Sequence, residues 1–490
     1  MKRIIKKTLS VVAILAMISI GTTVCAETIE TRIGKLSFTH DFASGYPTKE
    51  TVEKLYDERD FQRACQAYLW ALPLVGAAQA QQQSRTVLGL GDLDIGIGDS
   101  YEAKLGILTP NVTTAYISVL PDLSVTGPLV IETPRGATAG MVDDFWQRPV
   151  TDLGLAGPDR GQGGKYLLLG PGQTVPQSDG FIVVHSSTVN VIIGLRNLET
   201  DPEKAARVLS QYRVYPYAKR DNPPANRIVV IGNTKWSQAS PRGLAYWNLL
   251  ADILNREPVQ ERDRIMMAML RSLGIEKGKP FKPNERQKKI LTEAALVGEA
   301  MAKANDFDKR QMELSHYKEG VQWHLSLCLD PSQEAEFYTQ LDERAAWFYE
   351  ATTTSKGMVT KTPGLGQVYL GAYKDKDGNW LDGASTYRLH VPANAPVKQF
   401  WSLTIYDVDT RSLIDNQQKI ADRSSHQPDL MKNADGSVDL YVGPTAPKGF
   451  EKNWIPSVPG RAWFAYFRLY APTEAHFNRT WILPDFEKVK

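Results

Sequence analysis

Cysteine is scarce in this chain, with only three in 490 residues. That count excludes a disulfide-stapled scaffold and a cysteine-rich metal centre. Seven histidines are scattered along the sequence, and none stands at the spacing of a metal-binding motif. No complete catalytic motif is present either. We therefore expect no metal and no other cofactor, and the motifs alone do not identify a reaction.

Long apolar runs are confined to the N-terminus. Residues 9–20 are apolar and follow a basic segment, but they are too short for a membrane span, which needs about 20 apolar residues. Small residues at Val24 and Ala26 fit a cleavage site after Ala26. Residues 1–26 are thus predicted to be a secretory signal, and the mature protein to be soluble and periplasmic or secreted. A lipoprotein acylated at Cys25 is the alternative, which residues 22–24 disfavour.

An excess of charge of either sign is also lacking. The formal charge of the whole chain is +2, and removal of four basic residues with the signal brings it to −2. This near-neutral balance lacks the electrostatic footprint of a nucleic-acid-binding protein. The mature chain keeps two cysteines, Cys65 and Cys328, in apolar surroundings. They are interpreted as two buried thiols, with a disulfide between them as the alternative.

The apolar pattern of the mature chain changes along its length. Helical spacing dominates residues 48–83, with Pro73 expected to kink or end the helix. Short β-branched runs between turn residues then predict an antiparallel sandwich, a helical period returns near residue 239, and strands resume near residue 366. The predicted helices of the middle part are 241–255, 259–273, 284–304 and 333–350. The predicted divisions are the signal 1–26, a leader and helix 27–83, a β-sandwich 84–235, a helical domain 236–355 and a second β-sandwich 356–490.

Two groups of motifs resemble a known pairing of domains. The first resembles domain of unknown function 1254 and the second resembles domain of unknown function 1214. The resemblance implies an α+β fold with an N-terminal immunoglobulin-like β-sandwich, a helical middle domain and a C-terminal jelly-roll-like β-sandwich, in a family of exported bacterial proteins without a settled activity. The first resemblance is carried by residues 108–116 and 122–123, and the second by residues 400–407, 435–437, 453–456 and 468–472 with Trp481 and Pro484.

Asn111 and Tyr116 stand in the first of these motifs. The Asn111 amide can point into a pocket beside Tyr116 and bind a ligand. Alternatively, Asn111 follows Pro110 and caps the local backbone, as asparagine in turns commonly does.

Tyr406 and Asp407 end a predicted strand. Strand alternation places Ser402, Thr404 and Tyr406 on one face of it. A phenol and a carboxylate at the rim of a sandwich can act as general acid and base, which makes this pair the catalytic candidates. The alternative is that Asp407 pairs with Arg411 and holds the following loop.

Trp454 and Arg468 are the remaining candidates for a ligand site. A tryptophan on a loop can form an apolar platform for a sugar, or it can plug the end of a sandwich. An arginine within a β core needs a partner, so Arg468 is either an anion clamp or the partner of an acidic side chain.

Clefts between domains are the usual pocket sites, so we expect the site where the two β domains face each other. One hypothesis is a site for a small molecule or saccharide there, with Asp407 and Tyr406 as acid and base. The other hypothesis is a non-catalytic envelope-associated protein that binds a partner. Under this hypothesis the partner can be a second copy of the chain, in a homo-oligomer.

Overall fold

The computed structural model describes residues 26–199, 201–310 and 312–489. The predicted secretory signal therefore lies outside the described residues, apart from Ala26. The described chain divides into two compact units, one ending at Asp60 and the other beginning at Phe61. The first unit holds an antiparallel hairpin of β1 (Thr28–Thr31) and β2 (Gly34–Ser37) and the beginning of helix α1 (Lys49–Thr86).

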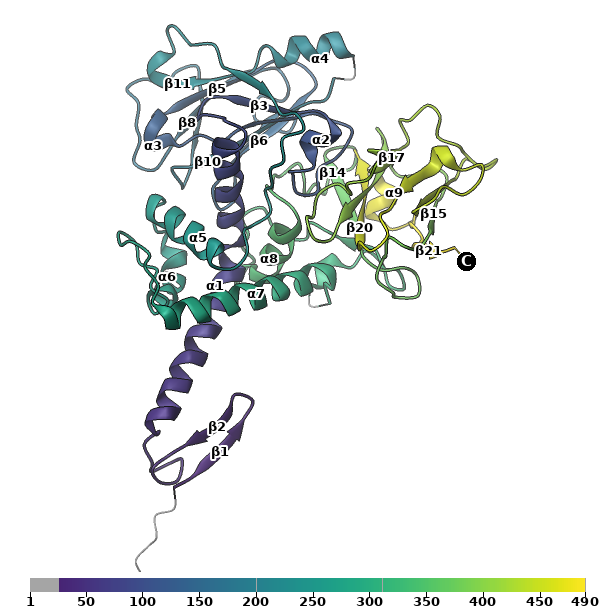
Figure 1. Ribbon diagram of the computed structural model, residues 1–490. Coiled ribbons are helices and arrows are strands. Elements are labelled where there is room, and N and C mark those ends of the chain that lie inside the picture. The colour runs from purple at the N-terminus through teal and green to yellow at the C-terminus, as the bar shows by residue number, and fades with distance from the viewer. Residues whose placement is uncertain (1–25, 200, 311, 490) are drawn as a thin grey trace, which may run out of the picture. The chain divides into compact units, whose positions relative to one another are not determined.

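The second unit is a mixed α+β structure (Figure 1). A β-rich region follows α1, helices fill the middle of the sequence, and a second β-rich region ends the chain. The α+β class and the order of these regions, as predicted from the change of apolar period, are confirmed at this level.

The first β-rich region consists of two sheets that share one apolar core. Ile117 and Val142 reach this core from one sheet, and Ile131 and Leu168 reach it from the other. Short helices α2 (Tyr101–Lys104), α3 (Leu123–Thr126), α4 (Pro202–Leu209) and η1 (Tyr217–Lys219) lie in the connections. Within the described chain, one sheet has the order β12 (Ile228–Val230), β3 (Ile95–Gly98), β4 (Tyr116–Val119), β10 (Val191–Asn197), β6 (Thr138–Asp144), β7 (Pro149–Gly154), and the other β11 (Arg213–Pro216), β5 (Leu129–Thr133), β8 (Gly164–Leu169), β9 (Ile182–His185).

Two helical segments differ from the expectations. Of the two outcomes expected at Pro73, a kink or an end of the helix, the end does not occur: α1 continues to Thr86 in a stretch that is buried on nearly every side, so tertiary packing outweighs the helix-ending tendency of the proline. Residues 333–340 are irregular rather than helical, because Gln333 has a positive φ of 64° and donates its amide to the carbonyl of Trp146. The helices here are α5 (Leu244–Arg256), η2 (Glu261–Asp263), α6 (Arg264–Arg271), α7 (Glu285–Phe307), η3 (Glu313–Ser315) and α8 (Leu341–Glu350).

The second β-rich region also has two sheets. Trp463 of one sheet packs edge-on against Tyr387 of the other, with ring centroids 5.6 Å apart. Short helices η4 (Glu451–Asn453) and α9 (Glu474–Phe477) complete it. In the described chain the sheet orders are β13 (His324–Leu325), β14 (Gln367–Ala372), β20 (Trp463–Tyr470), β16 (Trp401–Asp407), β17 (Asp422–Ser424), and β19 (Trp454–Pro456), β18 (Val438–Gly443), β15 (Tyr387–Val391), β21 (Glu487–Lys488).

Strands β16 and β20 are buried along their whole length. Trp401 and Phe467 stack on the face that packs against the second sheet, with centroids 5.3 Å apart. The other face carries Thr404, Tyr406 and Arg468, which contact one another. Because successive side chains of a strand point to opposite faces, one sheet presents an apolar core on one side and a polar aromatic surface on the other.

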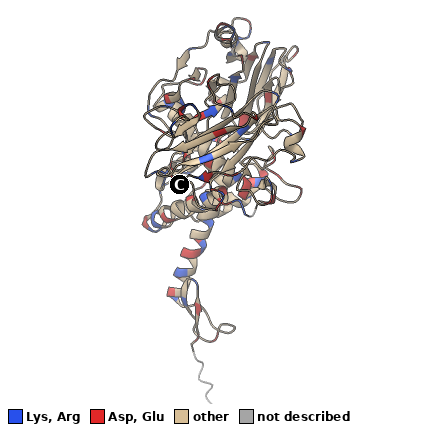
Figure 2. Ribbon diagram, turned by 90° about the vertical axis from the view of Figure 1, so that its right-hand side faces the viewer, with Lys and Arg blue, Asp and Glu red and all other residues tan. Residues whose placement is uncertain are grey.

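Three further features bear on function. No helix among residues 26–199, 201–310 and 312–489 has the length and apolar character needed to cross a membrane. Figure 2 shows lysine and arginine intermingled with aspartate and glutamate over the face in view. Cys65 is buried and Cys328 partly buried, and no disulfide joins these two described residues.

Candidate functional site

A cavity of about 1520 Å³ lies between the two β-rich regions. Strands β4, β6 and β10 of the first region and strands β14 and β20 of the second contribute to its lining, together with loops from both. The side chains that determine its chemistry are Tyr116, Arg196, Tyr369, Phe400, His426, Tyr466, Arg468 and Tyr470.

Arg468 lies on β20, in register with Tyr369 on β14. Its side chain is buried, at 2 % exposure. Nη1 donates to the hydroxyls of Thr404 and Tyr406, at 3.1 and 2.5 Å, and Nη2 donates to the Thr109 carbonyl at 2.8 Å. Since Thr109 belongs to the first β-rich region, Arg468 joins the two regions across the wall of the cavity.

The charge of Arg468 has no direct counter-ion. Among the described residues no carboxylate forms an ion pair with it. Asp422 acts on it from a distance, and burial raises the pKa of that carboxyl to about 6 against the opposing charges of Arg423, Lys104 and Arg468. Three tyrosine rings instead surround the guanidinium at 5.3–5.7 Å from their centroids, those of Tyr369, Tyr406 and Tyr466.

Arg196 reaches the cavity from the opposite side, on β10. Its guanidinium carbon lies 4.9 Å from the centroid of the Tyr116 ring. No group of the described chain hydrogen-bonds its guanidinium, so its N–H donors face the cavity unengaged. A planar cation stacked on an aromatic ring is held in place while its edge stays available to an acceptor.

One wall of the cavity is an aromatic stack. Phe400 packs face to face on Tyr470, with centroids 4.0 Å apart and planes at 16°. The His426 ring also packs on Phe400, tilted by 32°, with centroids 4.1 Å apart. A flat apolar surface of this kind suits an aromatic ring or another flat apolar group.

The ionisable groups of the lining are more often basic than acidic. Asp152 is the most enclosed of the acids, and burial raises its pKa, which favours the neutral form. The basic lining residues are Arg160, Arg196, Lys356, Lys398 and Arg468, and the acidic ones are Asp99, Asp152 and Glu199. The five cations and three carboxyls give the cavity a positive balance.

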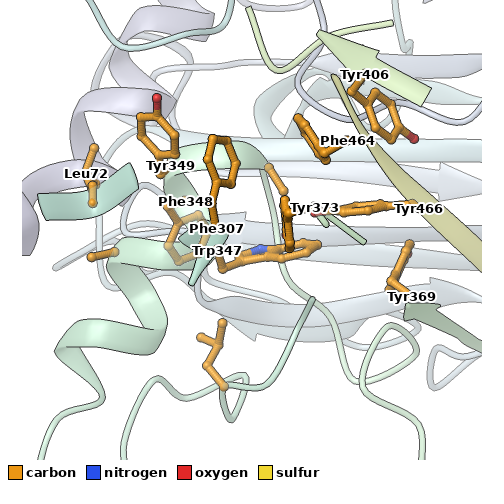
Figure 3. Close-up of a cluster of buried hydrophobic side chains, with 14 of the residues drawn as sticks. Leu72, Phe307, Trp347, Phe348, Tyr349, Tyr369, Tyr373, Tyr406, Phe464 and Tyr466 are labelled. Atoms are coloured by element: carbon orange, nitrogen blue, oxygen red, sulfur yellow. The ribbon is translucent and has the colours of Figure 1, made fainter. Parts of the chain in front are cut away.

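Tyr466 connects this cavity to a carboxylate that is completely buried. Tyr466 lines the cavity and donates its hydroxyl to Oε1 of Glu350, the last residue of α8. The hydroxyl of Tyr373 also donates to Glu350, at 2.9 Å from Oε2. Figure 3 shows Tyr466 and Tyr373 close together beside Phe464.

Behind Glu350 lies a second buried carboxyl group, that of Asp306. Burial and the neighbouring Glu350 raise the pKa of Asp306 well above its ordinary value. Burial also raises the pKa of Glu350, opposed by the charge of Lys309 and by the hydrogen bond from Tyr466. The Lys309 ammonium is 2.6 Å from Oδ1 of Asp306. Two carboxyls beside one lysine, without solvent, can share a proton.

Four of the six residues singled out in the sequence come together beside the cavity. The backbone N–H and the amide of Asn111 donate to the Tyr116 hydroxyl at 2.9 and 3.0 Å. Oδ1 of Asn111 accepts from the backbone N–H of Thr114, so Asn111 caps its own turn. Tyr406 donates to the carbonyl of Pro110 at 2.8 Å and accepts from Arg468. Tyr116 and Arg468 line the cavity.

Asp407 and Trp454 lie outside the cavity lining. One oxygen of Asp407 accepts from the backbone N–H groups of Asp409 and Thr410, and the other is 2.5 Å from Nε of Arg461. Its partner is thus Arg461 rather than Arg411. Trp454 belongs to strand β19, and its indole N–H donates to the carbonyl of Gly443 at 2.8 Å.

Sequence reasoning did not single out Arg196, Tyr466 or Glu350. Tyr466 had a usable signal, because it stands two positions before Arg468 on one predicted strand and so shares its face. Glu350 and Arg196 had none, since their neighbours in the fold are distant in the sequence. No group of three or more His, Cys, Asp or Glu able to hold a metal ion occurs among the described residues.

Comparison with known families bears on both halves of the predicted pairing. Residues 99–216 match the model of a protein of unknown function (DUF1254), and residues 366–474 match that of a protein of unknown function (DUF1214). Both members of the pair are present. The cavity is lined from both matched regions, by Tyr116 and Arg196 from the first and by Tyr466 and Arg468 from the second.

Comparison with solved structures concerns the fold alone. The VPA0106 protein from Vibrio parahaemolyticus superposes with a TM-score of 0.55 at 16 % identity, over 88 % of this chain and 100 % of that one. An uncharacterised protein from Burkholderia cenocepacia gives a TM-score of 0.40 at 12 % identity, over 90 % and 97 %. No curated protein matches the chain.

Proposed function

We propose that the cavity binds a small organic anion with a flat apolar body. The observation that carries this proposal is the unengaged guanidinium of Arg196, which is stacked on Tyr116 and lines the same cavity as Arg468. A carboxylate or similar group would accept from Arg196, and the apolar body would lie against Phe400 and Tyr470.

The positive balance of the lining favours an anion over a neutral saccharide. A neutral sugar would leave the Arg196 charge without a counter-ion in a partly enclosed site, whereas an anionic group compensates it. The aromatic stack suits either ligand, so a saccharide is the second candidate. Trp454, the platform suggested by the sequence, takes no part in this arrangement, because it lies outside the lining.

Acid–base chemistry in the cavity is the catalytic form of this proposal. We move the acid–base role from Asp407 and Tyr406 to Tyr466 and the carboxyl pair behind it. The Tyr466 hydroxyl gives a proton to the bound ligand and takes up the proton held between Glu350 and Asp306, which leaves the carboxyl pair one proton short. The pair regains that proton when the ligand releases another one to Tyr466 later in the same reaction, so no net proton is lost. Phenol and carboxyl are in contact already, as such a transfer requires.

A matched pair of variants tests the ligand site. Thermal unfolding is measured with an aromatic carboxylate, its neutral amide and a monosaccharide. The carboxylate is expected to raise the Tm of the wild type and not that of Arg196→Met. Arg220→Met is the control, because Arg220 stacks on Tyr217 at 4.3 Å in the same way but lies outside the cavity.

The alternatives give different results in that experiment. A shift with the monosaccharide alone would favour the saccharide. A carboxylate shift that survives Arg196→Met would contradict the assignment to Arg196. No shift with any compound would favour the non-catalytic, partner-binding protein.

We further propose that the chain is exported through residues 1–26, and that its β-rich regions are an immunoglobulin-like and a jelly-roll-like sandwich. Export is tested by N-terminal sequencing of the protein from the periplasmic or secreted fraction. A first residue of Glu27 supports it, and retention of Met1 in the cytoplasm contradicts it.

A further inference from the structure

A second cluster of buried positive charge lies away from the cavity, where the β6–β7 turn meets helix α8 and the buried part of α1. Arg148 follows Trp146 in that turn, and Arg344 lies on α8. Their side chains are almost completely enclosed, at 7 % and 1 % exposure. Neither residue lines the cavity described above.

Both guanidinium groups approach the same indole. Their central carbons lie 5.9 Å (Arg148) and 5.7 Å (Arg344) from the centroid of the Trp146 ring. Trp146 is itself buried and packs on Trp70, with centroids 4.8 Å apart. Two like charges are therefore held beside one ring, inside the protein, where water does not screen their repulsion.

Several hydrogen-bond donors of these two arginines have no acceptor in the described chain. Arg148 donates from Nε to the carbonyl of Ser332 at 3.2 Å, but its Nη1 and Nη2 have no partner. Arg344 donates from Nη2 to the carbonyl of Trp70 at 2.9 Å, but its Nε has none. Three nitrogens of buried cations thus lack an acceptor within the described chain, which is costly unless something supplies one.

No side-chain carboxylate fills this role. Asp144, Asp263 and Glu334 act on the two arginines from a distance, but none of the described carboxylates forms an ion pair with either. The nearest of them are engaged elsewhere: Asp263 accepts from the Trp70 indole, and Asp144 from the Arg148 backbone and the hydroxyl of Ser187. Burial, followed by the Arg148 charge, lowers the pKa of Arg344 to about 9, as expected for a cation without a neighbouring anion.

We propose that Arg148 and Arg344 together bind one small inorganic anion of the halide class, chloride, beside Trp146. The unpartnered N–H groups are its donors, and its charge compensates the repulsion between the two guanidinium groups. A halide fits because the surroundings are enclosed, whereas an organic anion would need an open pocket. The ion would fasten the β6–β7 turn to α8 and so contribute to the stability of the whole second unit.

Chloride titration of the full chain tests this site. Thermal unfolding is followed as chloride replaces gluconate at constant ionic strength, and the Tm is expected to rise by about 2 °C or more and then saturate. Arg344→Met and Arg148→Met should each abolish the rise. Arg411→Met is the matched control, because Arg411 is also buried but donates to the carbonyls of Tyr349 and Asp409, and its Tm should still rise with chloride.

Crystals of the wild type soaked in bromide give an independent measurement that does not require a variant to fold. An anomalous peak within hydrogen-bonding distance of Arg148 and Arg344 supports the proposal. Ordered water bridging Arg148 to the unpartnered Oε1 of Gln333, with no bromide there, overturns it. A Tm that is independent of chloride in the wild type overturns it as well.

Discussion

The hydroxyl of Tyr466 donates to the carboxylate of Glu350, and this hydrogen bond joins the wall of the cavity to a carboxyl pair that is sealed inside the protein. Tyr466 comes from β20 and Glu350 from the end of α8. Because a buried carboxylate depends on its donors, this contact matters both to the stability of the fold and to any proton transfer toward the cavity.

Removal of the Tyr466 hydroxyl should destabilise the protein. In Tyr466→Phe, the Glu350 carboxylate keeps the hydrogen bond from the Tyr373 hydroxyl and loses the one from Tyr466. We therefore expect a loss of about 1–3 kcal/mol in the free energy of unfolding. Urea unfolding measures it. Tyr369→Phe is the control, since Tyr369 lines the same cavity but no described residue hydrogen-bonds its hydroxyl. Equal losses in the two variants would show that the Glu350 contact contributes nothing specific.

Arg468 should matter far more than an arginine at the surface. Arg468→Met removes the charged group that donates hydrogen bonds to the hydroxyls of Thr404 and Tyr406 and to the carbonyl of Thr109. We expect a loss of about 3 kcal/mol in the free energy of unfolding. Arg388→Met removes an ion pair to Glu487 whose partners are 42 % and 41 % exposed, and should cost about 1 kcal/mol or less. Chemical denaturation of both variants provides the comparison, and a loss for Arg468→Met no larger than for Arg388→Met would contradict the bridging role.

Asp407 should prove structural. Asp407→Asn weakens the contact with Arg461 and is expected to lower the unfolding free energy by about 1–2 kcal/mol. Any Tm shift produced by a carboxylate ligand should persist in this variant, because Asp407 lies outside the cavity. If the variant were as stable as the wild type and yet lost the ligand shift, the acid–base role predicted from the sequence would regain support.

Asp422 should make stability fall as the pH rises through weakly acidic values. Its folded-state pKa of about 6 lies above the ordinary 3.8, so its contribution is complete below about pH 4 and is lost as the pH passes 6. The difference between these two pKa values corresponds to about 3 kcal/mol of unfolding free energy. We therefore measure the unfolding free energy of the wild type and of Asp422→Asn from pH 4 to 7. As the pH increases, the wild type should lose stability relative to the variant.

The matched control for this pH effect is Asp409→Asn. Hydrogen bonding to Arg242 lowers the pKa of Asp409, so its contribution is present at neutral pH and is lost on acidification, with the opposite sign. A difference between wild type and Asp422→Asn that does not change between pH 4 and 7 would contradict the raised pKa of Asp422.

Local pattern predicted much of what surrounds the site. Alternation along residues 400–406 placed Thr404 and Tyr406 on one face, and both contact Arg468 there. The competition between local propensity and packing explains why α1 does not end at Pro73, since the helix continues where the surrounding residues are buried. Asp407 illustrates another limit of local patterns. The sequence suggested the nearby Arg411 as its ion-pair partner, but the partner in the fold is Arg461, which is distant in the sequence.

The sequence by itself determined the α+β class, the order of its regions and the side of a strand on which a residue lies, because these depend on neighbours a few positions apart. Only the tertiary structure decided that Arg196 and Arg468 share one cavity, that Tyr466 meets Glu350, and that Asp407 and Trp454 lie elsewhere. Those relationships depend on sheet register and on the packing of distant segments, which no local spacing encodes.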